Sequence, residues 1–202
     1  MYTAVVFDFG NVLCSLERMN FAERAAAHSS LSAEAIDAAL WGGRLERDFE
    51  TGRLDSRAYF SEVKAIACFD PLYSYELFVK DYLSIIQPNP DGEAGLLTAK
   101  KLGARTFLLS NTSFLHATTI FTNETLASVP ELHILSYKIG RMKPDPEIWI
   151  ALLRYSGLTA EECLYVDDVA EYCDAAASLG FGTVNYKKNE QNLSQILESV
   201  LQ

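Results

Sequence analysis

Residues 4–13 have the sequence AVVFDFGNVL, in which an unbroken apolar run, Ala4–Phe7, is stopped by Asp8. Unbroken apolar character over so short a run is typical of a strand buried on both faces, as in a parallel sheet. Four further runs share this character, at residues 105–109, 133–135, 163–166 and 183–186. From residue 105 onward they alternate with segments of helical periodicity, so the sequence predicts an α/β fold with a parallel sheet.

Turn and cap residues mark the ends of the expected helices. Asp91 is placed to cap a helix that Gly103 ends. Asp145, followed by Pro146 as a first-turn proline, is placed to begin another helix, which Gly157 ends. Apolar stripes at helical spacing run along both segments and along the last residues of the chain, and we expect these stripes to face the core.

The segment 16–87 interrupts the alternation of strands and helices. It is far too long for a loop and contains no convincing strand. Two apolar stripes at helical spacing, within residues 59–66 and 75–86, predict helices instead. We therefore expect a helical cap subdomain, residues 16–87, inserted after the first strand of an α/β core that comprises residues 1–15 and 88–202. An insertion at this point would place the cap over the carboxyl ends of the strands.

The composition bounds the class of protein and its partners. Of 202 residues, 49% are hydrophobic and 22% charged, which predicts a well-buried core, and the formal net charge is −10. This charge disfavours nucleic acids and anionic membranes as partners, and it also repels a phosphorylated substrate, so a phosphate site must supply its own cation or backbone donors. Four scattered cysteines and an apolar run too short for a signal peptide or membrane span favour a cytoplasmic location.

Polar side chains follow three of the predicted strands at the point where each strand ends. Asp8 follows the first strand, Ser110 and Asn111 the second, and Asp167 and Asp168 the fourth. Ligands of an open parallel sheet bind beyond the carboxyl ends of its strands, so these side chains meet if the three strands are neighbours. An alternative for the Ser110–Asn111 pair is to cap the following helix.

Carboxylates that converge in this way repel one another unless a cation binds between them. Oxygen ligands suit Mg²⁺, which also tolerates water and phosphate among its ligands. Lys143, directly before Pro144, is the candidate positive partner of the acids. The strand ends therefore predict a site for a divalent cation and an anionic ligand.

Four short motifs occur in order along the chain: VFDFGNVL at residues 6–13, SNT at 110–112, KPD at 143–145 and VDD at 166–168. In this order, on predicted strand ends, they resemble the motifs of the haloacid dehalogenase (HAD) superfamily, with a Rossmann-like core and a cap placed as in subfamily I. The resemblance spans nearly the whole chain. The first motif most resembles a bacterial branch that includes α-D-glucose-1-phosphate phosphatase and is close to the N-terminal phosphatase domains of epoxide hydrolases.

The resemblance implies roles for the motif residues in phosphoryl transfer. Asp8 would attack phosphorus and form an aspartyl-phosphate, which water then hydrolyses. Ser110 and the backbone amides of Asn11 and Asn111 would donate hydrogen bonds to the phosphoryl oxygens. Lys143 would balance the charge on the nucleophile and on the transferring group.

The resemblance also implies a bound Mg²⁺. Its ligands would be Asp8, the backbone carbonyl of Gly10 and the carboxylate of Asp168. Asp167 would be a nearby or alternate ligand, and a structural role for it is equally open.

Gly10 is a departure from most phosphatases of this family, which have a second aspartate two residues after the nucleophile as general acid and base. Losing that group costs on the order of 10²–10⁴ in rate for an alcohol leaving group. Three interpretations follow. The substrate has a better leaving group, such as the anomeric oxygen of a sugar 1-phosphate; a cap residue or water supplies the proton; or the protein binds phosphate ligands without turning them over.

We therefore expect an enzyme, a magnesium-dependent phosphatase for a small phosphorylated metabolite, with a sugar phosphate as one candidate, acting as a monomer or homodimer. One alternative is a metal-independent 2-haloacid dehalogenase, which also lacks the second aspartate, although Gly10 departs from the Asp-x-Tyr-Gly pattern of those enzymes. The other is a catalytically impaired protein that binds phospho-ligands or interaction partners.

Overall fold

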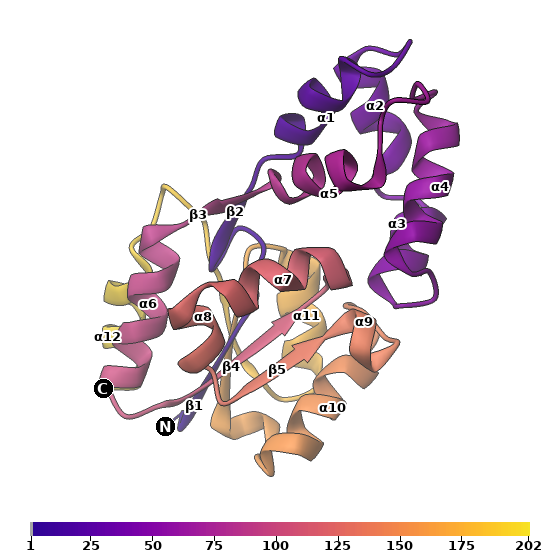
Figure 1. The fold of residues 1–202 in the computed structure, drawn as a ribbon. Helices are drawn as coiled ribbons and strands as arrows, with labels where there is room; N and C mark the ends of the chain where they lie inside the picture. The colour runs from indigo at the N-terminus through magenta and orange to yellow at the C-terminus, as the bar shows by residue number, and fades with distance from the viewer. Residues whose placement is uncertain (1) are drawn as a thin grey trace.

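The computed structural model describes residues 2–202, and a five-stranded parallel sheet with strand order β5-β4-β1-β6-β7 lies at its centre (Figure 1). The strands are β1 (Ala4–Phe7), β4 (Arg105–Ser110), β5 (Leu132–Leu135), β6 (Cys163–Asp167) and β7 (Gly182–Asn185). All five predicted strands are confirmed, with ends that differ by at most one residue. The α/β fold class is confirmed with them.

Alternate residues of the strands enter two different hydrophobic layers, which explains the unbroken apolar runs. In β1, Val5 and Phe7 face one layer, whereas Ala4 and Val6 face the other. The first layer is covered by the helices α6 (Pro90–Lys101), α7 (Phe114–Thr122), α8 (Glu124–Ser128) and α12 (Leu193–Leu201). The second is covered by α10 (Glu147–Ser156) and α11 (Ala170–Ser178). Two short helices, α9 (Ser136–Ile139) and η1 (Ala160–Glu162), complete this part of the chain.

Five helices between β1 and β4 pack around a hydrophobic cluster of their own, and we call them the five-helix unit. They are α1 (Arg18–Ala26), α2 (Ala33–Leu40), α3 (Arg44–Glu50), α4 (Ser56–Ile66) and α5 (Tyr75–Leu83). Aromatic stacking is prominent in this cluster, for example between Phe49 and Tyr59, whose ring centroids are 4.1 Å apart. Figure 1 shows the unit beyond the carboxyl ends of the sheet strands.

A two-stranded antiparallel ribbon joins the five-helix unit to the sheet. It consists of β2 (Cys14–Leu16) and β3 (Ile86–Pro88), so both chain crossings lie side by side (Figure 1). The sequence did not predict this ribbon, because three-residue strands with partly exposed side chains carry too little periodicity to be recognised. Pairing between residues some 70 positions apart is what forms them.

The predicted cap role of Asp91 is wrong, although the helix it belongs to is present. Helix α6 begins at Pro90 after Asn89, which places Asp91 in its first turn. The Asp91 carboxylate instead accepts hydrogen bonds from the hydroxyl of Tyr186 (2.6 Å) and the backbone amide of Leu193 (3.1 Å), tying α6 to the last helix. Pro90 has no N–H, so the start of α6 has one unpaired amide fewer to satisfy.

The helix predicted to follow Pro146 is present as α10. It ends at Gly157, which adopts a left-handed conformation as expected. Its N-cap is Pro146 rather than the predicted Asp145, whose side chain still accepts from the amide of Glu147 (3.0 Å). No helix among residues 2–202 is both long enough and apolar enough to cross a membrane.

Candidate active site

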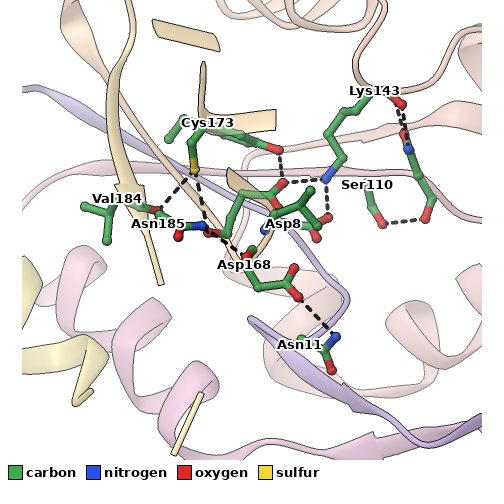
Figure 2. Close-up of polar contacts among 12 residues, drawn as sticks. Asp8, Asn11, Ser110, Lys143, Asp168, Cys173, Val184 and Asn185 are labelled. Atoms are coloured by element: carbon green, nitrogen blue, oxygen red, sulfur yellow. Dashed lines mark hydrogen bonds and ion pairs between the residues drawn. The ribbon is translucent and has the colours of Figure 1, made fainter. Parts of the chain in front are cut away.

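The three strands that carry the polar ends are neighbours in the sheet, because β1 pairs with β4 on one side and with β6 on the other. Asp8, Asp167 and Asp168 consequently lie together at the carboxyl edge. Each offers one carboxylate oxygen to a group whose atoms all lie within 4.8 Å of one another. The convergence predicted from the strand ends is therefore observed, and Figure 2 shows it.

Lys143 is the positive group of this site. Its ammonium lies 2.7 Å from Oδ1 of Asp8 and 2.7 Å from Oδ2 of Asp167 (Figure 2). Only 2% of the residue is exposed. Burial alone would lower the pKa of Lys143, but the charges of the two aspartates and its hydrogen bonds to them outweigh burial and raise that pKa, so the side chain stays charged.

The side chain of Asn111 holds the main chain of Lys143. Its Oδ1 accepts from the Lys143 amide (2.7 Å), and its Nδ2 donates to the Lys143 carbonyl (3.0 Å). The sequence pointed only to the backbone amide of Asn111 as a phosphate donor. A paired contact between residues 32 positions apart gave no local signal, so this positioning role was missed.

The carboxyl group of Asp8 is almost fully buried. Burial raises its pKa to about 7, assisted by the charges of Asp167 and Asp168, while Lys143 opposes the rise. With three carboxylates and one ammonium, the site carries two net negative charges when all groups are ionised. A single divalent cation would neutralise them, so the residues present fit Mg²⁺.

The two adjacent aspartates have different surroundings. Both oxygens of Asp167 are engaged: it accepts from Lys143, from the hydroxyl of Tyr165 and from the amide of Val169 (2.8 Å). Asp168 is partly buried and accepts one side-chain hydrogen bond, from Nδ2 of Asn11 (3.1 Å). Burial is the main reason why its pKa is raised. The carboxylate of Asp168 is thus more available than that of Asp167 to bind a cation.

The turn after the nucleophile is held by Asn11. Its backbone is left-handed, with a φ of 54°, a conformation that asparagine tolerates better than most residues. Its Oδ1 accepts from the amide of Leu16 (3.1 Å), while its Nδ2 reaches Asp168. The side chain of Asn11 therefore links the two strand ends of the candidate cation site, a role the sequence did not indicate.

Ser110 lies buried at the end of β4, where its hydroxyl donates to the carbonyl of Asn111 (3.2 Å). The N-cap of the following helix α7 is Ser113, whose side chain accepts from the amide of His116. The alternative in which Ser110 and Asn111 cap this helix is therefore wrong. Neither residue is taken up by the helix start, and the Asn111 side chain is bonded to the main chain of Lys143 instead.

The space beside Gly10 is taken by another residue. A Cβ atom at this position would lie 2.7 Å from Cδ1 of Leu16 and 4.0 Å from Oδ2 of Asp8. A side chain at position 10 would thus begin beside the Asp8 carboxylate, but the side chain of Leu16 occupies that space. Position 10, where most phosphatases that the motifs resemble carry the second aspartate, therefore offers no titratable side chain.

Two hollows lie between the five-helix unit and the sheet edge. The larger, about 550 Å³, borders Lys143 and Tyr172 and is lined by Arg47, Arg53 and Arg141. The smaller, about 80 Å³, borders Gly10 and Asn111 on the sheet side and Glu50 on the helical side. The larger hollow reaches the site at Lys143, and the smaller one reaches it at Gly10 and Asn111.

The family model of haloacid dehalogenase-like hydrolases matches residues 2–180. The chain belongs to this family. It is a hydrolase of the HAD type. The residues that form the site described above are the same ones that carry the family motifs in the sequence.

Known proteins resemble this HAD-like hydrolase over most of its length. Phosphatase MT3486 of Mycobacterium tuberculosis is 28% identical over 183 residues, covering 88% of this chain and 84% of the relative. The HAD family enzyme bt-2542 of Bacteroides thetaiotaomicron, crystallised with magnesium and inorganic phosphate, has a TM-score of 0.81 and 22% identity over 95% of this chain and 97% of that one. A crystallised dehalogenase has a TM-score of 0.75 and 18% identity, over 100% and 98%. The two structures share the fold of this hydrolase.

Proposed function

We propose that this HAD-like hydrolase is a magnesium-dependent phosphatase that transfers the phosphoryl group of a small phosphorylated metabolite to Asp8 and then to water. The observation that carries the proposal is the buried ammonium of Lys143, 2.7 Å from both Asp8 and Asp167, with Asp168 alongside. The phosphatase relative and the structure with bound magnesium and phosphate support the same activity.

Asp8, Asp168 and the backbone carbonyl of Gly10 would hold the Mg²⁺. The ion supplies charge neutralisation for the carboxylates and for the oxygens of the transferring phosphoryl group. Asp167, with both oxygens engaged by Lys143, Tyr165 and Val169, serves in this proposal mainly to hold the lysine, and is at most an alternate ligand.

The chain's own residues account for the covalent steps. Lys143 holds Oδ1 of Asp8, which leaves Oδ2 to attack phosphorus as the bond from phosphorus to the leaving oxygen breaks. Ser110 and the amides of Asn11 and Asn111 would donate to the phosphoryl oxygens, and Lys143 would offset the charge that develops. Water then attacks the phosphorus of the aspartyl-phosphate, which releases inorganic phosphate and restores Asp8.

Residues 16–87, which contain the five-helix unit and the ribbon residues nearest to it, would act as the cap over a core of residues 1–15 and 88–202. The two hollows between the parts would receive the leaving group and shield the reaction from bulk water. A sugar phosphate is one candidate substrate, because its hydroxyl groups suit a polar hollow of this kind.

Phosphate release from a panel of small phosphate esters, including sugar 1-phosphates, tests the activity in the presence of Mg²⁺. We expect turnover by the wild type and none by Asp8→Asn. Equal rates for the two proteins on every ester would refute the proposal. An aspartyl-phosphate analogue trapped with beryllium fluoride would separate a true phosphatase from a protein that only binds phospho-ligands.

A metal-independent 2-haloacid dehalogenase is the second candidate. The lack of a second aspartate at position 10 and the likeness to a crystallised dehalogenase favour it, whereas Gly10 departs from the tyrosine of those enzymes. Chelation distinguishes the two candidates: chloride release from 2-chloropropionate that persists in excess EDTA would support the dehalogenase, whereas EDTA-sensitive phosphate release supports the phosphatase.

A further inference from the structure

Hydrolysis of an alkyl phosphate needs a proton donor for the leaving oxygen, and Gly10 cannot provide one. Four titratable residues line the smaller hollow beside Gly10: Arg18, Glu46, Glu50 and His116. A substitute donor must face the nucleophile from this hollow, and it must carry a proton that it can release near neutral pH.

We propose that Glu50, the last residue of α3, is the general acid and base of this enzyme in place of the side chain missing at Gly10. This inference rests on the proposed phosphatase activity. Glu50 would reach the substrate from the five-helix unit, on the opposite side of the leaving group from Asp8.

Hydrogen bonds hold the end of α3 against the sheet edge. The backbone carbonyl of Glu50 accepts from the hydroxyl of Ser136 (2.6 Å). The same hydroxyl accepts from the amide of Thr112 (2.8 Å), which belongs to the loop that follows β4. One buried serine thus connects Glu50 to the loop that carries Ser110 and Asn111, so the position of Glu50 over the site is set by the core.

Glu50 lines the hollow that lies beside the reacting groups. It lines the hollow together with Gly10 and Asn111, and it lies close enough to Asp8 and Lys143 for both charges to act on it. Burial raises the pKa of Glu50 to about 8, with the charges of Glu46 and Asp8 adding to the rise and Lys143 opposing it. A pKa raised in this direction suits an acid that keeps its proton until the leaving oxygen takes it.

The other three residues in the hollow do not suit the task. An arginine such as Arg18 does not release its proton. Burial lowers the pKa of His116 to about 4, so this imidazole is neutral at pH 7 and has no acidic proton to give readily. One oxygen of Glu46 accepts from the amide of Gly42 (2.6 Å), and the charge that acts on this carboxyl is that of Arg18 rather than those of Asp8 and Lys143.

The proton balance closes over the two steps. As the phosphorus–oxygen bond of the ester breaks, the Glu50 carboxyl gives its proton to the leaving oxygen and becomes a carboxylate. That carboxylate then takes a proton from the water that attacks the aspartyl-phosphate. The alcohol and inorganic phosphate are released, and both Glu50 and Asp8 return to their starting states.

Leaving-group dependence tests the proposal, with Glu50→Gln compared with the matched hollow variant Glu46→Gln. For an alkyl phosphate we expect Glu50→Gln to lower kcat on the order of 10²–10⁴-fold, and Glu46→Gln to lower it less than about tenfold. For p-nitrophenyl phosphate, whose leaving group needs no proton, Glu50→Gln is expected to release a rapid burst of about one nitrophenol per site, followed by slow turnover.

The burst is a signature that a merely structural role would not produce, and it also reports that the site is folded. If Glu50→Gln does not fold, Glu50→Asp serves instead: it keeps an acid and is expected to retain more alkyl phosphate turnover than Glu50→Ala. Three results would overturn the role of Glu50 but leave the proposed phosphatase activity standing. They are alkyl phosphate turnover by Glu50→Gln within threefold of the wild type, equal losses of turnover in Glu50→Asp and Glu50→Ala, and slowed turnover of p-nitrophenyl phosphate by Glu50→Gln with no burst. A wild type that releases no phosphate from any ester would overturn both proposals.

Discussion

Lys143 decides the electrostatics at the scale of single residues. Its ammonium is shared by Asp8, the candidate nucleophile, and by Asp167, so removing either partner changes the charge balance of a buried site. A lysine on a solvated surface would have contributed little, since exposed ion pairs are weak. Burial makes the same pair a determinant of both charge state and stability.

Asp8→Asn is expected to stabilise the cation-free protein at pH 8 while abolishing turnover. The pKa of Asp8 is raised from 3.8 to about 7 in the folded protein. A carboxyl that binds protons more tightly when folded lowers the free energy of unfolding progressively as pH rises from about 4 to 7, and the penalty persists above pH 7. The neutral amide of Asn removes this penalty but binds Lys143 more weakly than a carboxylate does. The net increase in the free energy of unfolding is on the order of 2 kcal/mol.

Urea denaturation in EDTA at pH 4 and pH 8 measures this effect. The stability difference between Asp8→Asn and wild type should be small at pH 4 and large at pH 8. Asp174→Asn, on an exposed position of α11, is the control and should show no such trend. A difference that does not depend on pH would contradict the assignment.

The two neighbouring aspartates are expected to differ in their response to substitution. Asp168→Asn should raise the Mg²⁺ concentration for half-maximal turnover by ~10-fold or more, because it removes the freer carboxylate. Asp167→Asn should mainly lower kcat, because it releases Lys143 from one of its two partners. Magnesium titrations of steady-state turnover in both variants check this. The reverse pattern would show that Asp167 is the ligand.

Elements rather than single residues set the access to the site. The ribbon β2–β3 carries both chain crossings, and α3 is the helix of the five-helix unit that meets the core at α9. Gly52, just after α3, lies against this contact: a Cβ there would overlap the backbone oxygen of Tyr137. The docking of the helices on the core therefore depends on a backbone position without a side chain.

Gly52→Ala is expected to disturb docking, with a lower kcat and a higher KM for a small ester. Gly42→Ala is the matched control, because Gly42 has a similar positive φ (75° against 71°) and no atom within 4 Å of the added Cβ. Both variants carry the cost of a left-handed alanine, roughly 1 kcal/mol, but only Gly52→Ala also meets the core. Steady-state kinetics alongside thermal unfolding separate the two effects. Identical kinetics for both variants would argue against docking through Gly52.

For the whole molecule, the net charge of −10 and the acidic cluster act in the same direction on a cation. Both attract Mg²⁺, and dissolved salt screens the attraction over about 8–10 Å at physiological ionic strength. We expect the Mg²⁺ concentration for half-maximal turnover to rise as NaCl increases from about 20 to 200 mM. Magnesium titrations with potassium chloride in place of sodium chloride control for a specific ion effect. A constant or falling value would contradict this expectation.

The sequence by itself determined the five strands, the polar residues at three strand ends and the family, because unbroken apolar runs and short motifs are local features. The candidate site requires that those strand ends be adjacent, and the β4-β1-β6 strand order confirms that they are. The catalytic roles of the residues stay predictions. Tertiary structure alone decided that Asp167 pairs with Lys143, that Asn111 bonds to the Lys143 main chain, that the ribbon forms, and that Glu50 lines the hollow beside Gly10. These contacts join residues 24 or more positions apart, and side-chain partners at such separations are chosen by packing and burial, which leave no periodic trace in the chain.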